Sequence, residues 1–498
     1  MRTKAVTCAL ALLLAGSAMA QVDRNAFRER QQQMREQFVQ QRNQARRQYA
    51  DERRKAEEEY AAFRRKANED YAAAMRQAWE KMTVSPAETR PSEPKPPQPP
   101  KAVPDRMPQS IPLPQSEVVL PPSPVAPVPM PPIPEPEPSA PALQLQFYGT
   151  ACSMHAEPAD LRFKLPSIDE RTLSETWQKL SLEKYDGILH DCIAQRETLQ
   201  LSDWGYLRLL GDASQRLLGD GSDEAVLLQM YLMAQSGYRV RIARVGGHLV
   251  LLVPFNCNVY NYSFTVIDGI RHYLLTQEKV QSLDVCNVKF PREQVANLLM
   301  GNLPDLKGTV RRRTLQAESF GTMKATVEVE QGLIDYLDDY PRFEWEDYAR
   351  AGLSAGVKKS LYPVLRSQLE GKSARKAATM LLDFVQTAFE YQTDEEQFGY
   401  ERPLFADESI FYPYNDCEDR SIFYSILVRD LLGLDVMLVH WPGHLATAVH
   451  FPEEVEGDYY TVDGQRYTIC DPTYIGAGIG ETMPMYQDVS AKLVKIGK

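Results

Sequence analysis

Three residues near the end of the chain could together form a nucleophilic site: Cys417, His444 and Asp471. A thiol attacks a carbonyl carbon only as its thiolate, so it needs a neighbouring base and a group that orients that base. In this set Cys417 would be the nucleophile, His444 the general base and Asp471 the residue that orients the imidazole. The predicted chemistry is acyl transfer through a thioester.

The sequence before and after Cys417 predicts a helix with the thiol at its start. Asn415 and Asp416 are good N-cap residues, apolar residues recur at helical spacing from Ile422 onward, and Gly433 is a suitable helix end. Backbone N–H groups at a helix N-terminus favour a thiolate and the oxyanion of acyl transfer. We therefore expect a lowered pKa for the Cys417 thiol.

The base and the acid are predicted at the ends of strands. Runs typical of strands cover residues 436–440 and 444–451, so that His444 begins a strand. After a hairpin turn at Asp463-Gly464, a strand at residues 466–470 leads directly into Asp471.

The order of these motifs resembles that of the transglutaminase-like superfamily of papain-type cysteine enzymes. The matching segments are Asp-Cys-Glu-Asp at 416–419, Gly-His at 443–444 and Asp-Pro-Thr at 471–473. The resemblance implies the roles given above for Cys417, His444 and Asp471. His440 and His450 are alternative bases, but His440 lies inside an apolar strand and His450 lies further along its own strand.

An internal repeat predicts a second copy of the same fold earlier in the chain. Residues 220–253 align without a gap on residues 416–449, and the Gly-His pair recurs at 247–248. Asp268, after a strand-like run, parallels Asp471 in this alignment. Gly221 stands where the later copy has Cys417, so we expect a degenerate copy that binds or braces; the alternative is that Ser222 takes the place of the nucleophile.

The N-terminal part of the chain is predicted to contain three different segments. Residues 1–20 have a basic start, an apolar run and an Ala-Met-Ala end, which is typical of a signal peptide. Residues 21–84 are densely charged with an eleven-residue apolar period that includes Phe38, Tyr49 and Tyr71, which predicts a long helix or coiled coil. Residues 85–142 are dominated by proline, which predicts a disordered or polyproline II linker.

The predicted fold class is α+β, with two tandem transglutaminase-like domains after the helix and linker. The boundaries are residues 143–328 for the degenerate domain with its connector and 329–498 for the catalytic domain. Within the second, Gln397–Tyr414 is loop-like, and we expect its aromatic side chains to form the wall of the cleft in front of Cys417: Phe398, Tyr400, Phe405, Phe411, Tyr412 and Tyr414.

Composition narrows the classes of partner. The formal net charge is −11 and the basic residues of the N-terminal helix are interleaved with acidic ones, which argues against nucleic acid. The chain has neither a CxxC nor an HExxH pattern, so no metal or other cofactor is predicted. No stretch after the signal peptide is long and apolar enough for a transmembrane segment. Expected partners are a protein or peptide substrate, and a helix partner or second copy for the coiled coil.

These features predict an exported, periplasmic or extracellular hydrolase: a transglutaminase-like cysteine protease or amidase acting on peptide or isopeptide bonds. Transfer to an amine, which would make it a transamidase, uses the same thioester. The alternative from another class is a non-catalytic scaffold or binding protein that uses two transglutaminase-like domains and a coiled coil.

Overall fold

The computed structural model describes residues 24–90, 95, 98–102, 110–120, 143–156, 161–182 and 185–496. The predicted signal peptide lies outside these residues. Residues 1–63 and residues 64–498 form two compact units, and each is described by itself. Within the described part of the chain, no helix combines the length and the apolar character that a membrane crossing requires.

The predicted N-terminal helix is present as α1 (Arg24–Met75), but it ends earlier than expected. Residues 79–83 form the strand β1 (Trp79–Thr83) instead, so the helix prediction is wrong for the end of the 21–84 segment. The reason is tertiary: β1 pairs with a strand of the first sheet, and Met82 and the buried Val84 pack against the core of that sheet.

The last turns of α1, in the second unit, are built into a core. Tyr71 is 3% exposed and stacks on Trp177 with ring centroids 4.4 Å apart. Arg64 donates to both carboxylate oxygens of Asp186 at 2.8 and 3.0 Å. In the first unit, Tyr49 of the same eleven-residue row is 70% exposed. The single apolar row is therefore buried in one part of the helix and exposed in another.

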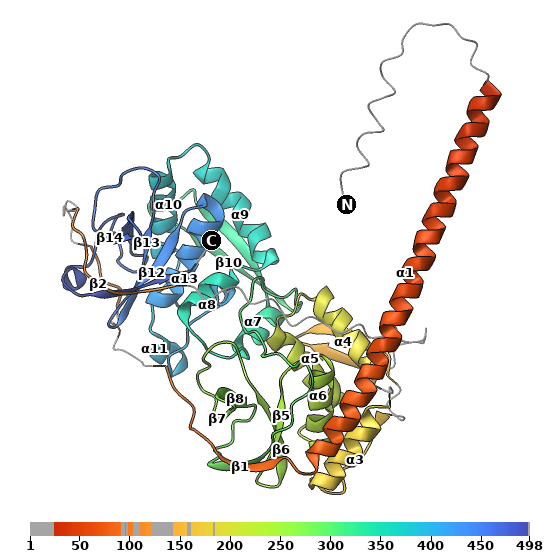
Figure 1. The fold of residues 1–498 in the computed structure, drawn as a ribbon. Coiled ribbons are helices and arrows are strands. Elements are labelled where there is room, and N and C mark those ends of the chain that lie inside the picture. Colours follow the sequence, from red (N-terminus) through yellow and green to blue (C-terminus); the bar gives the residue numbers. More distant parts are fainter. Residues whose placement is uncertain are drawn as a thin grey trace. The chain divides into compact units, whose positions relative to one another are not determined.

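The structure is a mixed α and β fold with two six-stranded sheets of the same strand order. The first sheet runs β1, β9 (Ser282–Cys286), β5 (Arg241–Val245), β6 (His248–Val253), β8 (Ile270–Leu274) and β7 (Phe264–Ile267). The second runs β2 (Gln115–Val119), β16 (Ala491–Lys495), β12 (Val436–Trp441), β13 (His444–Val449), β15 (Gln465–Cys470) and β14 (Tyr459–Val462). In Figure 1, β12, β13 and β14 lie together, as do β5 and β6.

Helices and two hairpins complete the fold. The helices are α3 (Glu170–Leu180), α4 (Asp186–Thr198), α5 (Asp203–Leu218), α6 (Asp223–Gln235), α7 (Gln331–Asp338), α8 (Trp345–Ala351), α9 (Ala355–Leu369), α10 (Ala374–Thr387), α11 (Asp394–Phe398), α12 (Ala406–Phe411) and α13 (Cys417–Leu427). The hairpins pair β3 (Leu143–Phe147) with β4 (Thr150–Met154), and β10 (Val310–Gln316) with β11 (Lys324–Glu330). A boundary at residues 328 and 329 stays a prediction, since residues 64–498 form one compact unit.

The repeat recurs in the sheets, but one of its predicted equivalences is wrong. Asp268 lies with Gly269 in the β7–β8 turn, both at positive φ, as Asp463 and Gly464 do in the β14–β15 turn. Asp268 therefore corresponds to a turn residue and not to Asp471. The β6–β8 register, which pairs Leu252 with Leu274, instead places Thr276 at the position of Asp471.

The described residues of the proline-rich segment differ from the expected disordered linker. β2 pairs in parallel with β16 and forms an edge of the second sheet. The backbone of Ala102 donates to Ile475 O at 2.9 Å, and Leu113 N donates to Tyr459 O at 2.8 Å. Proline has no backbone N–H, and it is tolerated at a sheet edge because the backbone donors there have no partner strand.

The packing of α1 predicts a large difference between two tyrosines of the same row. Tyr71→Ala should lower the free energy of unfolding of the full chain by about 3–5 kcal/mol, since it empties a buried aromatic site. Tyr49→Ala, the matched control, should change it by less than about 0.5 kcal/mol. Urea unfolding followed by tryptophan fluorescence measures both. Equal, small effects would contradict the burial of Tyr71 against Trp177.

Candidate active site

Cys417 begins a helix, as the sequence predicts. Asp416 is the N-cap of α13, and its backbone N–H donates to Asp419 Oδ2 at 3.3 Å. The helix continues as a π-helical turn (Val428–Leu432) and ends at Gly433, whose φ is 66°. Cys417 is 2% exposed, and the backbone N–H of Leu445, next to His444, is directed at its sulfur.

His444 and Asp471 form a buried hydrogen-bonded pair. The distance between His444 Nε2 and Asp471 Oδ2 is 2.8 Å, and the two residues are 3% and 2% exposed. Asp471 Oδ1 accepts from the backbone N–H groups of Thr473 at 2.9 Å and Tyr474 at 3.1 Å. The carboxylate is thereby fixed, and Nδ1 is the ring nitrogen that the pair with Asp471 leaves for other chemistry.

Side chains that the sequence analysis missed hold this pair in place. The imidazole is nearly parallel to the rings of Tyr486, at 5.3 Å, and Trp441, at 6.0 Å. Gln386 on α10 donates to the carbonyl oxygens of Asp471 at 3.0 Å, Tyr474 at 2.9 Å and Ala477 at 3.1 Å. An amide in a helix 85 residues before Asp471 has no local sequence signal for this role.

The loop before Cys417 is held by another residue whose role the sequence did not reveal. Arg313 on β10 donates to the carbonyl oxygens of Ile410 and Pro413, each at 3.0 Å, and to that of Tyr412. Three carbonyl groups of the segment that leads to Asp416 are thus bound by one guanidinium. Arg313 therefore fixes the backbone of the loop before Cys417.

Cys417 and His444 open onto one cavity of about 270 Å³. Its other walls combine charged and aromatic residues: Arg90, Lys95, Tyr260, Glu344, Trp345, Glu346, Glu401, Glu418, His440, Gly443, Leu445, Lys492 and Val494. None of the six aromatic residues expected to form this wall is among them. Phe405 and Phe411 are buried instead, and Tyr400 lines a neighbouring cavity of about 570 Å³.

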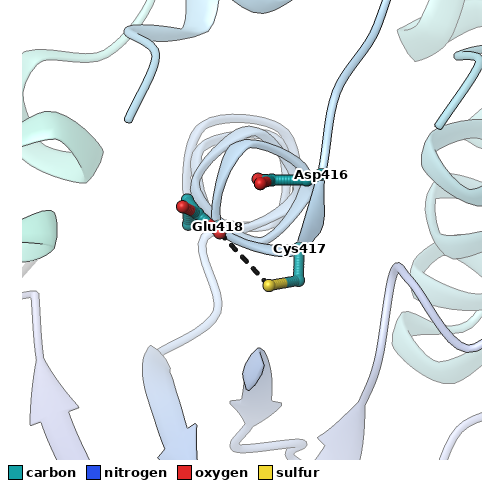
Figure 2. Close-up of side chains that lie close together, drawn as sticks. All are labelled: Asp416, Cys417 and Glu418. Atoms are coloured by element: carbon teal, nitrogen blue, oxygen red, sulfur yellow. Dashed lines mark hydrogen bonds between the residues drawn. The ribbon is translucent and has the colours of Figure 1, made fainter. Parts of the chain in front are cut away.

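The thiol of Cys417 does not bond to the imidazole in this structure. It donates to Glu418 Oε2 at 3.1 Å, as Figure 2 shows beside Asp416. Burial, followed by the charges of Glu418 and Asp416, raises the pKa of Cys417 well above its ordinary value, although Lys95 and the Leu445 N–H act against this. The expected lowered pKa is therefore wrong: two carboxylates beside a buried sulfur outweigh the helix N-terminus.

Carboxylates gather around the start of α13 in what we call the carboxylate pocket, defined by Asp394, Glu401, Asp416, Glu418 and Asp419. Lys95 Nζ lies 2.8 Å from Glu401 and 2.7 Å from Asp416, and it also contacts Glu418. Within the pocket, Asp394, Asp416 and Asp419 are one of several groups whose oxygens lie within 4.8 Å of one another, close enough to hold a metal ion.

The charge of the pocket is divided unequally. Burial opposes ionisation of Glu418, but the Lys95 ammonium and hydrogen bonds from Glu401 and Asp416 overcome it and lower the pKa of Glu418. Burial and the neighbouring Glu418 charge raise the pKa of Asp416, and raise that of Glu401 to about 8. Glu418 is therefore the principal anion beside Cys417, and Lys95 is its counterion.

The equivalent position in the first sheet lacks this arrangement. Gly221 replaces the cysteine, and the His248 side chain is 73% exposed. The N–H of Leu249, which corresponds to Leu445, donates to Asp223 Oδ1 at 2.7 Å. Ser222 is the N-cap of α6 and accepts from Ala225 N, so its hydroxyl serves the helix end and not a nucleophilic site.

The two alternative bases lie in other surroundings. His440 packs against Trp345 with ring centroids 4.7 Å apart, and it also lines the cavity. His450 Nδ1 lies 2.9 Å from Arg466 O, away from the cavity walls. Asp471 orients His444 and neither alternative.

Comparison with protein-family models, with curated proteins and with solved structures found no match for this chain.

The position of Glu418 predicts the pH dependence of thiol alkylation. Because the pKa of Cys417 is raised, thiolate forms only as pH rises through that high value, so iodoacetamide should label Cys417 slowly at neutral pH and faster in alkali. Glu418→Gln removes the largest opposing charge and should shift the profile to lower pH. Peptide mass spectrometry localises the label.

Glu396→Gln, on the exposed side of α11, is the matched control and should keep the wild-type profile. A Glu418→Gln profile that coincides with the wild type would contradict the electrostatic coupling of Glu418 to the thiol.

Proposed function

We propose that this chain is a cysteine-dependent acyl-transfer enzyme of the transglutaminase-like, papain-type fold, with Cys417 as nucleophile. The observation that carries the proposal is that His444, paired with the buried Asp471 at 2.8 Å, lines the same cavity as the Cys417 thiol. Supporting this, the nucleophile, base and acid come from α13, β13 and the end of β15, which are adjacent in the fold. The likeness between the two sheets supports tandem copies, of which the first lacks a nucleophile.

The proposed reaction runs through a thioester. The thiol proton passes to His444 Nδ1 while the sulfur attacks the carbonyl carbon of the substrate, and the resulting tetrahedral intermediate collapses as His444 returns the proton to the leaving amine. Water then attacks the thioester, His444 takes its proton, and collapse releases a carboxylic acid and restores the thiol. Asp471 stabilises the imidazolium at both stages.

We propose that water attacks the thioester, so that the net reaction is hydrolysis of a peptide or isopeptide bond. The alternative outcome is transfer of the acyl group from the same thioester to an amine. We further propose that the protein is exported to the periplasm, on the basis of its N-terminal sequence.

The second candidate function is a non-catalytic scaffold or binding protein, and a specific observation favours it. The thiol is buried, bonded to Glu418 and faced by the Lys95 ammonium. Catalysis by Cys417 requires these contacts to change when substrate binds, whereas a scaffold function requires no change.

Substitution of the three residues separates the two functions. Cleavage of a peptide library by the full chain, followed by mass spectrometry, should disappear in Cys417→Ala and fall by about 10³-fold or more in His444→Ala. Asp471→Asn should lower kcat/KM by about 10²–10⁴-fold, since the imidazole loses its orienting charge. His450→Ala is the control and should retain activity.

The same assay in ¹⁸O-water distinguishes the acyl acceptor. Hydrolysis places one ¹⁸O in each new carboxylate, while transfer to an amine places none. Cleavage that persists in Cys417→Ala would contradict the proposed cysteine enzyme. Binding of a partner without cleavage by the wild type or any variant would also contradict it and favour the scaffold.

A further inference from the structure

The carboxylate pocket already contains a ligand, which is a side chain of the same protein. Lys95 Nζ contacts Glu401, Asp416 and Glu418, with Asp394 further away at 4.0 Å, and the Lys95 side chain is 10% exposed. An ammonium has three N–H donors, and each of the three near carboxylates offers it an acceptor. The pocket thus matches a primary ammonium in both charge and number of acceptors.

The pocket is adjacent to the proposed nucleophile. Asp416 and Glu418 flank Cys417 in sequence, and Lys95, Glu401 and Glu418 line the same cavity as the thiol and His444. A cationic group held here lies beside any carbonyl group that reaches the sulfur. The carboxylates are therefore placed to select a substrate and not only to stabilise the fold.

Lys95 belongs to a segment that we call the strap, defined by residues 88–90, 95 and 98–102. Backbone hydrogen bonds secure it on both sides: Asn261 N donates to Glu88 O at 2.8 Å, and Ile475 N donates to Pro100 O at 2.9 Å. Between these points, Arg90 lies over the Trp345 ring at 3.7 Å and Lys95 enters the carboxylate pocket.

The strap lies between two cavities that share a wall. Arg90, Tyr260 and Glu401 line both the cavity of about 270 Å³ at Cys417 and the neighbouring one of about 570 Å³. Arg90 and Lys95 of the strap therefore form part of the wall of the cavity that contains the thiol.

Lys95 does not satisfy every acceptor of the pocket. Asp416 is fully buried, and its Oδ1 has no hydrogen-bond partner among the described residues. The same side chain accepts from Lys95 through Oδ2 and shares a hydrogen bond with Glu418, so Asp416 links the ammonium to the anion beside Cys417.

Lys95 itself is a poor acyl acceptor. Burial opposes its charge, but the charges of Glu418 and Asp416 overcome this and hold the pKa of Lys95 well above its ordinary value. An ammonium has no lone pair to attack a thioester. This leaves Lys95 the role of a ligand that blocks the pocket.

We propose that the carboxylate pocket is a binding subsite for a primary ammonium group of the substrate, and that Lys95 occupies it as an intramolecular blocking ligand. The inference rests on the proposed function for its effect on catalysis, whereas ammonium binding can be measured without turnover. The substrate class is a peptide with a free α-amino group or a lysine side chain near the scissile bond.

Thermal unfolding of the full chain tests the subsite directly. In Lys95→Ala, ethylammonium chloride in tenfold excess over its Kd should raise the Tm by about 1–2 °C and then saturate. Tetramethylammonium chloride at equal ionic strength, which has no N–H donor, should not. EDTA is present throughout because carboxylates also bind divalent cations.

Wild type and Lys101→Ala are the matched controls. Lys101 is an exposed lysine of the strap, and with Lys95 in place neither protein should respond to ethylammonium beyond the effect of salt. If Lys95→Ala does not fold, Lys95→Ser, which leaves a hydroxyl donor, replaces it. The proposal would be overturned if ethylammonium raised the Tm of Lys95→Ala no more than tetramethylammonium does. It would also be overturned if ethylammonium raised the Tm of the controls by the same amount.

A kinetic comparison links the subsite to catalysis. Lys95→Ala should cleave a peptide with a free ammonium near the scissile bond with a kcat/KM about tenfold or more above that of its acetylated form, as expected for hydrogen bonds to a charged group. Turnover without this preference would overturn the subsite. Ammonium binding without turnover of any peptide would support the subsite and contradict the proposed function.

Discussion

The hydrogen bond between His444 and Asp471 is the constraint on which the candidate site depends. It requires β13 and β15 to pair in one register, because a shift of a single residue would turn the imidazole or the carboxylate to the other side of the sheet. The backbone pairs of Thr447 with Cys470 and of Val449 with Thr468 fix this register, and the loop after Asp471 is fixed by Gln386. Without these supports the imidazole would have neither a fixed orientation nor a counterion.

The charge around Cys417 works against the thiolate, and this shapes the whole site. A catalytic thiol usually lies in electropositive surroundings, whereas this one bonds to Glu418 and has Asp416 as its other neighbour in sequence. Lys95 is the compensating cation, and it is supplied by a distant segment of the chain. The site in the structure is thus a neutral thiol with a neighbouring ion pair, and its reactivity depends on what replaces or moves that pair.

Local sequence patterns predicted the elements that carry the site. The N-cap at Asp416, the helix end at Gly433, the strand that starts at His444 and the Asp463-Gly464 turn are all present, because each depends on residues close in sequence. The sequence also shows the repeat, although its second half is misaligned. A strand followed by an aspartate occurs both at the β7–β8 turn and at the end of β15, and only the pairing of the strands distinguishes the two.

What the sequence could not show are long-range contacts. Proline content predicts a free linker, yet β2 completes the second sheet and Lys95 reaches Glu418, more than 300 residues away. The raised pKa of Cys417 has the same origin, since burial and several charges act together. Gln386 and Arg313 bind backbone carbonyls that no pattern in their own segments indicates.

The central claim is that Cys417 forms a thioester with His444 as its base. Intact-mass spectrometry of the full chain after mixing with an activated ester, over a range of increasing pH, measures this most directly. The account predicts one acyl group on Cys417 that hydroxylamine removes and that His444→Ala does not acquire. An acyl group on other residues alone, or one that His444→Ala acquires equally fast on Cys417, would contradict it.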